Sequence, residues 1–365
     1  MSKKNNFLSR IQPHLRSNDT YQGVITTTQM SEHSGKDIKS VIRLNANENP
    51  YGANEKIKQS LQRIDLHLYP DPNQTTLRKA LSDYTDQPEE RLMAGAGGDE
   101  IIDLLMRLFV SPGDMVLDCN PTFGMYSFSA KLAGAKLISI PRKHDWAIDL
   151  ERIIEHSNTS KIIFIASPNN PTGNLLSESE AIEILDSGIL LVVDETYFEF
   201  SNNSLANLTE EYDNLIILRS FSKWAGIAGL RVGYAISSPD LTNILMAIKQ
   251  PYNINVAGEI AAITALNYRD DILVNVKNLL EQRTILEKFV KRYRPKINYY
   301  PSHGNFLLCH FENMSGSDVY KKLVSEGIFV RTFSDPLLSK CVRISSGTPE
   351  QTDRLLGALK NIVIS

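Results

Sequence analysis

The side chains with the clearest chemical potential lie in the stretch SFSKWAGIAGLR, which runs from Ser220 to Arg231. The apolar run just before it, residues 215–218, is typical of a buried strand. Lysine forms Schiff bases with carbonyl compounds when its site lowers its pKa, so Lys223 could hold a carbonyl cofactor covalently. Ser220, Ser222 and Arg231 could bind a phosphate on the same molecule. Taken alone, however, the stretch is better explained by an ordinary surface lysine that follows a strand.

Two earlier apolar runs also end in polar side chains. Residues 161–166 lead into PNNPTGN, where two prolines fix a turn and present the amide of Asn170. Residues 189–193 lead directly into Asp194, and Tyr197 follows closely. A carboxylate at the edge of a buried sheet needs a cationic partner. The structural alternatives are a simple turn at Asn170 and a helix-capping acid at Asp194.

A glycine-rich turn, GAGGDEIIDLLMRLF, opens a further predicted helix. Free backbone N–H groups and the helix dipole at such a start favour an anion, although a turn capped by Asp99 would be sufficient structurally. The turn is not a dinucleotide-binding fingerprint, because Glu100 stands where the third glycine is required. It also lacks the Gly-Lys-Ser/Thr ending of a mononucleotide loop. A nucleotide-binding oxidoreductase, the alternative from another functional class, is therefore disfavoured.

Together these segments offer one set of complementary groups. Asp194 suits a ring nitrogen, Tyr197 and Asn170 suit a ring oxygen, and Lys223 suits an aldehyde. Cationic side chains and N–H groups suit a phosphate. These are the polar requirements of pyridoxal phosphate, which the sequence therefore predicts as the cofactor.

The elements that would position these groups alternate along the chain. Predicted strands cover residues 115–117, 136–140, 161–166, 189–193, 215–218 and 232–236, and predicted helices cover 99–109, 126–133, 150–155 and 178–186. Continuous apolar strands interleaved with helices indicate an α/β fold, with a mostly parallel central sheet and helices on both faces. Ligands bind beyond the carboxyl ends of such strands, where the polar groups follow.

The pattern changes near residue 255. A helical stretch at 258–292, with a break near residues 268–270, precedes short strands at 298–300, 305–310, 328–331 and 341–345. This pattern predicts a smaller α+β C-terminal domain. The expected organisation is an N-terminal helix and arm (1–43), a large cofactor-binding domain (44–255) and a small domain (256–365).

Composition places the chain among soluble globular proteins. Its 365 residues carry a net charge of −3, with 42% apolar and 22% charged residues, so neither nucleic acid nor a membrane is expected as a partner. Three scattered cysteines favour a reducing compartment and offer no zinc spacing, so no metal is expected.

The basic N-terminus suggests either a docked amphipathic helix, using Phe7, Leu8, Ile11 and Leu15, or a transit peptide. We favour the docked helix, a loop-like arm at 16–40 and a cytoplasmic protein.

The motifs SPNNPTGN, VVDETY, SFSK and AGLRVGY resemble those of fold-type I, pyridoxal-phosphate-dependent aminotransferases, in the class II-like branch. The resemblance extends over nearly the whole chain. LNANENPYG, YPDP, GGDEIIDLLMRLF, PTFGMYSFSA, GNFLL, GIFVR and CVRISSGT are similar to the histidinol-phosphate aminotransferase family in particular. The resemblance implies transfer of an amino group between L-histidinol phosphate and 2-oxoglutarate, giving imidazole acetol phosphate and L-glutamate, in L-histidine biosynthesis.

This resemblance also implies a role for individual residues. Lys223 would be the Schiff-base lysine and proton carrier, Asp194 would pair with the pyridinium nitrogen, and Tyr197 and Asn170 would bond the ring hydroxyl. The remaining cofactor contacts would be Phe123 on the ring face and, at the phosphate, Gly98, Asp99, Ser220, Ser222 and Arg231. Tyr69 in YPDP would reach the phosphate of the neighbouring subunit's cofactor, which implies a homodimer.

For the substrate, the resemblance implies that Arg343 binds the α-carboxylate of glutamate and that Arg331 binds the phosphate of histidinol phosphate. A solvated strand-end arginine is the structural alternative for Arg331. Tyr21 and Asn47 lie in segments that line the same pocket in relatives.

Two positions depart from the family pattern. Trp224 stands where a small residue is usual, and the opening motif around Tyr21 reads only Thr20-Tyr21-Gln22-Gly23. The alternatives within the fold are an aromatic amino-acid aminotransferase and a threonine-phosphate decarboxylase. A catalytically silent scaffold is disfavoured, because Lys223, Asp194 and the arginines are all present.

Overall fold

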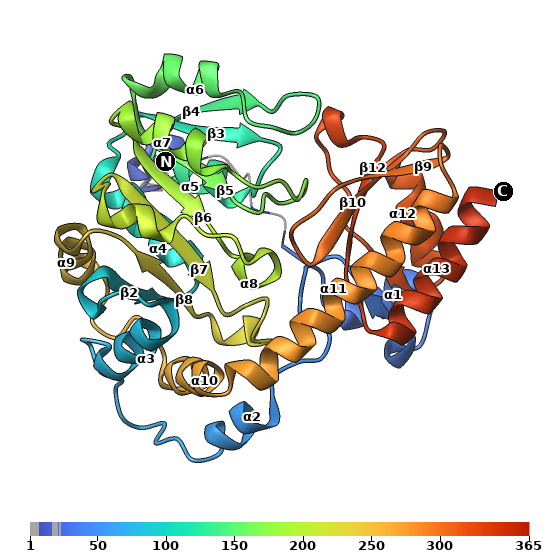
Figure 1. Cartoon of the computed structure of the whole chain (residues 1–365), viewed down its shortest axis with the longest axis horizontal. Helices are drawn as coiled ribbons and strands as arrows, with labels where there is room; N and C mark the ends of the chain where they lie inside the picture. Colours follow the sequence, from blue (N-terminus) through green and yellow to red (C-terminus); the bar gives the residue numbers. More distant parts are fainter. Residues whose placement is uncertain (1–6, 17–20, 22, 365) are drawn as a thin grey trace, which may run out of the picture.

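A computed structural model describes residues 7–16, 21 and 23–364, so Thr20 and Gln22 of the opening motif lie outside the described part. Its larger unit is built on a seven-stranded sheet in the order β2-β8-β7-β6-β5-β3-β4 (Figure 1). Strand β8 is antiparallel to both of its neighbours, and the other described pairs are parallel. The strands are β2 (Leu92–Gly95), β3 (Met115–Asn120), β4 (Lys136–Pro141), β5 (Ser160–Ala166), β6 (Leu190–Asp194), β7 (Leu215–Ser220) and β8 (Gly233–Ile236).

Both faces of this sheet are buried, as continuous apolar strands require. Alternate residues of one strand enter two different cores: Ile163 and Ile165 of β5 join one, and Ile162 and Phe164 join the other. Helices cover both faces, so the predicted α/β architecture is confirmed. They are α2 (Glu55–Leu61), α3 (Thr75–Thr85), α4 (Gly98–Phe109), α5 (Met125–Leu132), α6 (Leu150–Ser157), α7 (Glu178–Asp186), α8 (Phe198–Ser201), α9 (Pro239–Ile248) and α10 (Val256–Asn267).

The smaller unit has its own core around an antiparallel sheet in the order β12-β10-β9. Beside it, β1 and β11 form a short parallel pair. The strands are β1 (Ile42–Arg43), β9 (Ile297–Tyr300), β10 (Phe306–Phe311), β11 (Ile328–Phe329) and β12 (Cys341–Ser345). The helices are α1 (Thr27–Ser34), α11 (Arg269–Arg292), α12 (Gly316–Ser325) and α13 (Pro349–Ile364). Helix α11 runs from the larger unit into the smaller one (Figure 1).

The packing differs from the expected organisation at both boundaries. Helix α10 packs on α2 and α3, and its Ala261 and Ala265 belong to the core of the larger unit. At the other end, Ile42 and Leu44 join the core of the smaller unit. The periodicity over 258–292 predicts the helices and the break between them, but it cannot tell which core each helix faces.

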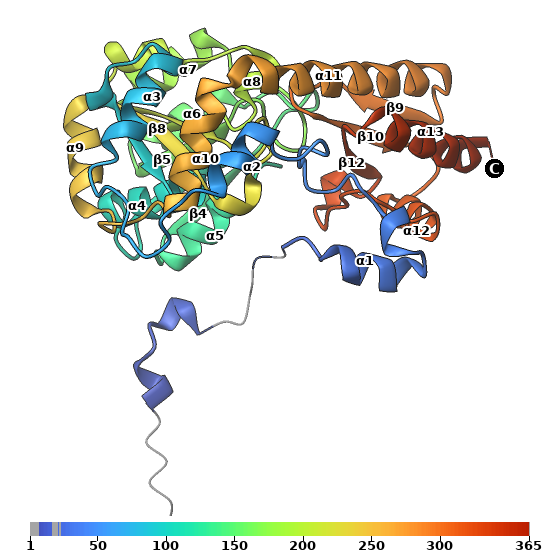
Figure 2. The same ribbon diagram turned by 90° about the horizontal axis from the view of Figure 1, so that it is seen from below.

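The predicted N-terminal helix is wrong. Residues Phe7–Arg10 and Pro13–Leu15 form two 3₁₀ turns without a buried residue. The second turn contacts α5, where Nε2 of His14 lies 3.2 Å from the carbonyl of Leu132, and the first turn lies farther from the body of the molecule (Figure 2). Within the predicted arm, α1 begins at a capping box formed by Thr26 and Gln29. Apolar spacing indicates that a face exists, but it does not say what covers that face. No helix among the described residues is long and apolar enough to cross a membrane.

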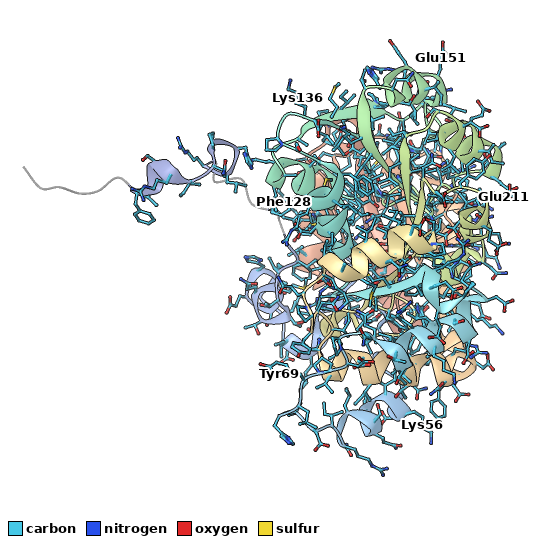
Figure 3. The ribbon with its side chains drawn as sticks, turned by 90° about the vertical axis from the view of Figure 1, so that its left-hand side faces the viewer. Lys56, Tyr69, Phe128, Lys136, Glu151 and Glu211 are labelled. Atoms are coloured by element: carbon cyan, nitrogen blue, oxygen red, sulfur yellow. The ribbon has the colours of Figure 1, made fainter. Side chains whose placement is uncertain are left out.

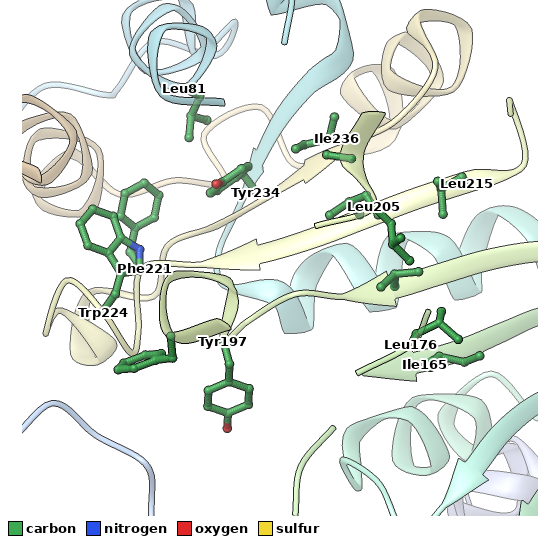
Figure 4. Packing of buried hydrophobic residues seen from close by; sticks show 14 of the residues in the cluster. Leu81, Ile165, Leu176, Tyr197, Leu205, Leu215, Phe221, Trp224, Tyr234 and Ile236 are labelled. Carbon is green, nitrogen blue, oxygen red and sulfur yellow. The ribbon is translucent and has the colours of Figure 1, made fainter. Parts of the chain in front are cut away.

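Trp224 lies in the core of the larger unit. Its ring is fully buried and stacks on Tyr84 of α3, with ring centroids 5.8 Å apart and an interplanar angle of 15°. Figure 4 shows it beside Phe221, while the hydroxyl of Tyr197 points away from this group. The indole therefore fills space between the β7 end and α3, which accounts for a large residue directly after Lys223.

Candidate active site

The carboxyl ends of β5, β6 and β7 open into a cavity of about 460 Å³ that residues of both units line. Fourteen of the predicted site residues line it: Tyr21, Asn47, Gly98, Asp99, Phe123, Asn170, Asp194, Tyr197, Ser220, Ser222, Lys223, Arg231, Arg331 and Arg343. They come together because parallel strands end at the same edge of a sheet. The smaller unit supplies the two arginines that face this edge.

Lys223 lies in the wall of the cavity just after β7. Its Nζ donates a hydrogen bond to the carbonyl of Ala46 at 3.0 Å. Burial, followed by the nearby charge of Arg343, lowers the pKa of Lys223 to about 8. A neutral amine is the form that attacks carbonyl groups and accepts protons, so this environment increases the reactive fraction near neutral pH.

The same burial makes a prediction about the protein without its cofactor. Between pH 8 and 10.5 the unfolded chain holds a proton at Lys223 that the folded chain has lost, so folding stability rises with pH across this window. At pH 7 the buried charge costs roughly 3 kcal/mol, which corresponds to the lowering of its pKa from 10.5 to about 8. We therefore expect Lys223→Met to raise the free energy of unfolding by about that amount at pH 7, and the gain to disappear above pH 10.5.

Urea titrations of the cofactor-free proteins at pH 7 and 10.5 would measure this difference. Lys249→Met is the matched control, because the Nζ of Lys249 is also buried but bonds the carbonyls of Pro72, Gln250 and Pro251. Its removal leaves these acceptors unpaired and should destabilise the protein. An equal gain from Lys223→Met at both pH values would contradict the burial of a charge.

Asp194 ends β6 and is 8% exposed. Its Oδ2 accepts a hydrogen bond from the hydroxyl of Tyr126 at 2.7 Å, and its Oδ1 accepts one from the N–H of Thr196 at 3.0 Å. Burial raises the pKa of Asp194, and these two donors oppose the shift. No Lys, Arg or His of the described residues forms an ion pair with it. A buried carboxylate held in this way suits a cationic ligand group.

The opposite side of the cavity suits an anion. Helix α4 begins at Gly98, and the positive φ of Gly97 (79°) turns the chain into it. A side chain at Gly97 would collide with Arg231, whose Nη2 would lie 2.6 Å from an added Cβ. Arg231 pairs with Asp99 at 2.8 Å. A cation beside the first N–H groups of a helix is a favourable site for a phosphate.

Two arginines of the smaller unit form another part of the wall. Arg343 is 6% exposed, and burial lowers its pKa to about 10. It donates to Oδ1 of Asn170 at 2.5 Å and to the carbonyl of Asn45 at 2.6 Å. Arg331 lies beside it through paired main-chain hydrogen bonds of 3.0 and 2.9 Å. Two guanidinium groups so close together suit carboxylate or phosphate ligands.

Further hydrogen bonds fix the aromatic and amide groups. Asn47 donates to the hydroxyl of Tyr197 at 2.9 Å and accepts from Ser345 at 2.8 Å. Asn47 has a left-handed backbone (φ 53°), which asparagine tolerates better than most residues. Phe123 meets Tyr126 edge to face, with centroids 5.6 Å apart. Tyr21 has a similar contact with Phe128 at 6.1 Å.

Tyr69 is the predicted site residue that does not line the cavity. Its side chain is 80% exposed at the surface of the molecule (Figure 3) and stacks on Tyr252, with ring centroids 4.4 Å apart. Leu66 and Leu68 of the same segment are also exposed. Within one chain, Tyr69 is therefore separate from the other predicted residues.

Sequence reasoning missed several groups of the site. Tyr126, the donor to Asp194, lies in the quoted motif PTFGMYSFSA, but its partner lies 68 residues away. Asn45 contributes a carbonyl rather than its side chain. Phe333 and Thr122 also line the cavity. No local pattern marks these contacts, since each depends on tertiary packing.

Comparison with known proteins agrees with this geometry. The model of the family "Aminotransferase class I and II" matches residues 39–359. The chain belongs to this family. The predictions of the family, of an aminotransferase and of pyridoxal phosphate as its cofactor are thereby confirmed.

Individual members of the family are similar to this chain over most of its length. This aminotransferase is 40% identical over 363 residues to the histidinol-phosphate aminotransferase of Roseiflexus castenholzii, covering 96% of this chain and 98% of that protein. It is 42% identical over 326 residues to that of Dehalococcoides mccartyi, covering 89% and 91%. Among solved structures, the Sinorhizobium meliloti histidinol-phosphate aminotransferase bound to pyridoxal 5'-phosphate has a TM-score of 0.88 at 24% identity, over 98% of both chains. This last similarity supports the fold.

Proposed function

We propose that this protein transfers an amino group between L-histidinol phosphate and 2-oxoglutarate, forming imidazole acetol phosphate and L-glutamate, in L-histidine biosynthesis. One observation carries the proposal. A lysine of lowered pKa and a buried carboxylate share a cavity with two neighbouring arginines of the smaller unit. The names of the curated relatives support the same activity.

The residues around Lys223 fit pyridoxal phosphate. When bound, this cofactor supplies an electrophilic aldehyde and a ring that accepts an electron pair from the substrate. Nζ of Lys223 is the nucleophile and moves the proton at the substrate Cα. The carboxylate of Asp194 would hold the ring nitrogen in its protonated form. Tyr197 and Asn170 would hold the ring hydroxyl oxygen by hydrogen bonds, and Phe123 would pack on the ring.

The phosphate of the cofactor is assigned to the start of α4. Gly98 and Asp99 offer N–H groups there, and Ser220, Ser222 and Arg231 offer side-chain donors. Charge-assisted hydrogen bonds of this kind are shorter and stronger than neutral ones. Since Arg231 already pairs with Asp99, the pair would hold the guanidinium in place before the phosphate arrives.

The smaller unit provides the arginines that bind the substrates. Arg343 binds the α-carboxylate of glutamate, and Arg331 binds the phosphate of histidinol phosphate. Two adjacent guanidinium groups can donate hydrogen bonds either to a carboxylate or to a phosphate, which explains how one site could bind both substrates. Tyr21 and Asn47 complete the substrate pocket. The bond from Arg343 to Asn170 links the substrate side to the cofactor side.

The proposal includes a homodimer in which Tyr69 reaches the cofactor phosphate of the partner. Exposed Tyr69, Leu66 and Leu68 support it, because a tyrosine with exposed apolar neighbours on one surface segment suits an interface. We also assign the protein to the cytoplasm. Cys119, Cys309 and Cys341 are all free and buried, which suits a reducing compartment.

Steady-state assays with 2-oxoglutarate as the amino acceptor would test the substrate assignment. We expect kcat/KM to be higher for L-histidinol phosphate than for L-phenylalanine. We expect no decarboxylation of O-phospho-L-threonine. The assays separate the alternatives of the same fold, because only one of the three compounds combines an imidazole with a phosphate. A higher kcat/KM for phenylalanine than for histidinol phosphate would show that the assignment is wrong.

A further inference from the structure

Residues 331–335 form a short segment of the smaller unit that closes one side of the cavity. Arg331 and Phe333 of this segment line the cavity. The segment starts at paired main-chain hydrogen bonds between Arg331 and Arg343, which fix it to the edge of β12. The guanidinium of Arg331 has no hydrogen bond or ion pair with the described residues. Its position therefore depends on how the main chain of the segment is held.

The far end of the segment is held by the other unit. Oδ2 of Asp335 accepts a hydrogen bond from Nδ2 of Asn120 at 2.7 Å, across 215 residues of sequence. Asn120 is the last residue of β3 in the large sheet. The second carboxylate oxygen of Asp335 accepts from the N–H of Leu337 at 2.9 Å and caps the 3₁₀ turn Pro336–Leu338. One carboxylate thus joins the segment to both units.

Trp146 makes a second contact between the same parts. It lies in the loop after β4, yet it packs with Leu308, Leu338 and Cys341 of the smaller unit, and Phe333 packs against this cluster. Figure 1 shows this loop beside the segment that precedes β12. Trp146 has a left-handed backbone (φ 66°), and Arg142 donates to its carbonyl at 3.0 Å. Such backbone conformations persist where the surroundings hold them.

We propose that the hydrogen bond between Asn120 and Asp335 is a positioning contact for substrate recognition, which holds residues 331–335 so that Arg331 faces the phosphate of the substrate. The proposal rests on the proposed function, since it assigns Arg331 to a phosphate. Trp146 provides the apolar part of the same contact. Asn120 and Asp335 are not among the residues that line the cavity, so they act through Arg331 and Phe333.

The geometry explains why one hydrogen bond would matter here. Arg331 has a long side chain with considerable rotamer freedom, and phosphate binding must fix it. If the segment is already anchored at both ends, less freedom is lost when the phosphate binds. A lost hydrogen bond at the Asp335 end should therefore weaken phosphate binding by about 5- to 10-fold, without changing the reacting groups near Lys223.

Three variants test the contact. Asn120→Ala removes the donor and leaves the cap by Asp335 intact. Asn120→Asp places two carboxylates against each other and should separate them. The double variant Asn120→Asp/Asp335→Asn reverses the bond, because the new amide can donate to residue 120 while its oxygen still caps Leu337.

Single turnovers of cofactor-loaded enzyme should be followed with L-histidinol phosphate and with L-histidinol, which lacks the phosphate. We expect both single variants to raise the dissociation constant of histidinol phosphate about 5- to 10-fold with an unchanged limiting rate, and to leave histidinol unaffected. The double variant should restore wild-type values. Hydrogen exchange should show faster exchange of the Leu337 and Leu338 amides in Asn120→Asp, and slow exchange again in the double variant.

Equal losses with both substrates, or no rescue in the double variant, would overturn the proposal and leave the contact a structural one. Unchanged binding in Asn120→Asp despite faster exchange would overturn it as well. A wild-type enzyme that binds histidinol as tightly as histidinol phosphate would instead refute the phosphate role of Arg331. That result requires no variant, so the two failures are distinguishable.

Discussion

Replacing Lys223 by alanine should remove the visible absorption band of protein purified with pyridoxal phosphate, and should lower turnover by at least about 10³-fold. Lys223 is the only lysine among the described residues that line the cavity. In the proposed function it serves both as the nucleophile and as the group that moves the substrate proton, so a single substitution would remove two functions. Absorption spectra of the purified protein and single-turnover rates with L-glutamate would measure the effect.

The buried Lys249 provides the matched control. Lys249→Met should keep the band, although the protein is destabilised, because its ammonium group lies outside the cavity lining. An externally added amine such as methylamine should restore part of the turnover of Lys223→Ala, since it replaces a proton acceptor. A colourless wild-type protein that takes up no pyridoxal phosphate would contradict the cofactor assignment itself.

The second large effect is expected for Asp194→Asn. An asparagine keeps the shape of the side chain but cannot balance a positive charge on the ring nitrogen. Removing such a preorganised electrostatic partner lowers kcat by about 10²- to 10³-fold. Cofactor binding should weaken too, because the buried amide no longer attracts a cationic ring. Single-turnover rates and titration of the cofactor-free protein with pyridoxal phosphate would measure both quantities.

Two further variants serve as comparisons for the loss of rate expected in Asp194→Asn. Tyr126→Phe removes one of the two donors to Asp194 and should give a loss smaller than that of Asp194→Asn. Asp118→Asn changes another buried acid, whose carboxylate bonds Ser139 and lies outside the cavity lining. It should affect stability more than rate. If Asp194→Asn retained more than about a tenth of the wild-type rate, the carboxylate would not be the partner of the ring nitrogen.

The polar residues at the strand ends could be predicted from the sequence, because each apolar run and the polar side chain that follows it are adjacent in the chain. Residues 189–193 are apolar throughout, and Asp194 comes immediately after them, so burial and position follow from a few adjacent residues. The position of Lys223 after a buried strand followed in the same way, but its role followed only when the other strand ends were considered with it. Since parallel strands share an edge, the approximate meeting of these residues followed without knowledge of the loops.

The contacts between the two units could not be predicted in this way. Arg343 donates to the carbonyl of Asn45 across 298 residues, and Asn120 meets Asp335 across 215. Such pairs depend on how the smaller unit docks, for which no periodicity exists. The boundary near residue 255 shows the same limit, because α10 packs on the larger unit, whereas α11 contributes Val276 to the core of the larger unit and Val290 to that of the smaller one. The resemblance indicated Arg331 and Arg343, and the structure showed the side-chain partners of Arg343 and the main-chain pairing of Arg331.

The positions of the cofactor-site and substrate-site residues along the chain also determine the order in which they are synthesised. Residues assigned to the cofactor phosphate and ring nitrogen lie between Gly98 and Arg231, so they leave the ribosome well before the C-terminus. Arg343, by contrast, belongs to β12, close to the end of synthesis. Domains generally fold as units during synthesis, N-terminal parts first. We therefore expect a nascent chain to form the site for the cofactor phosphate before Arg331 and Arg343 face the cavity, so that cofactor can be captured by a protein that does not yet recognise a substrate.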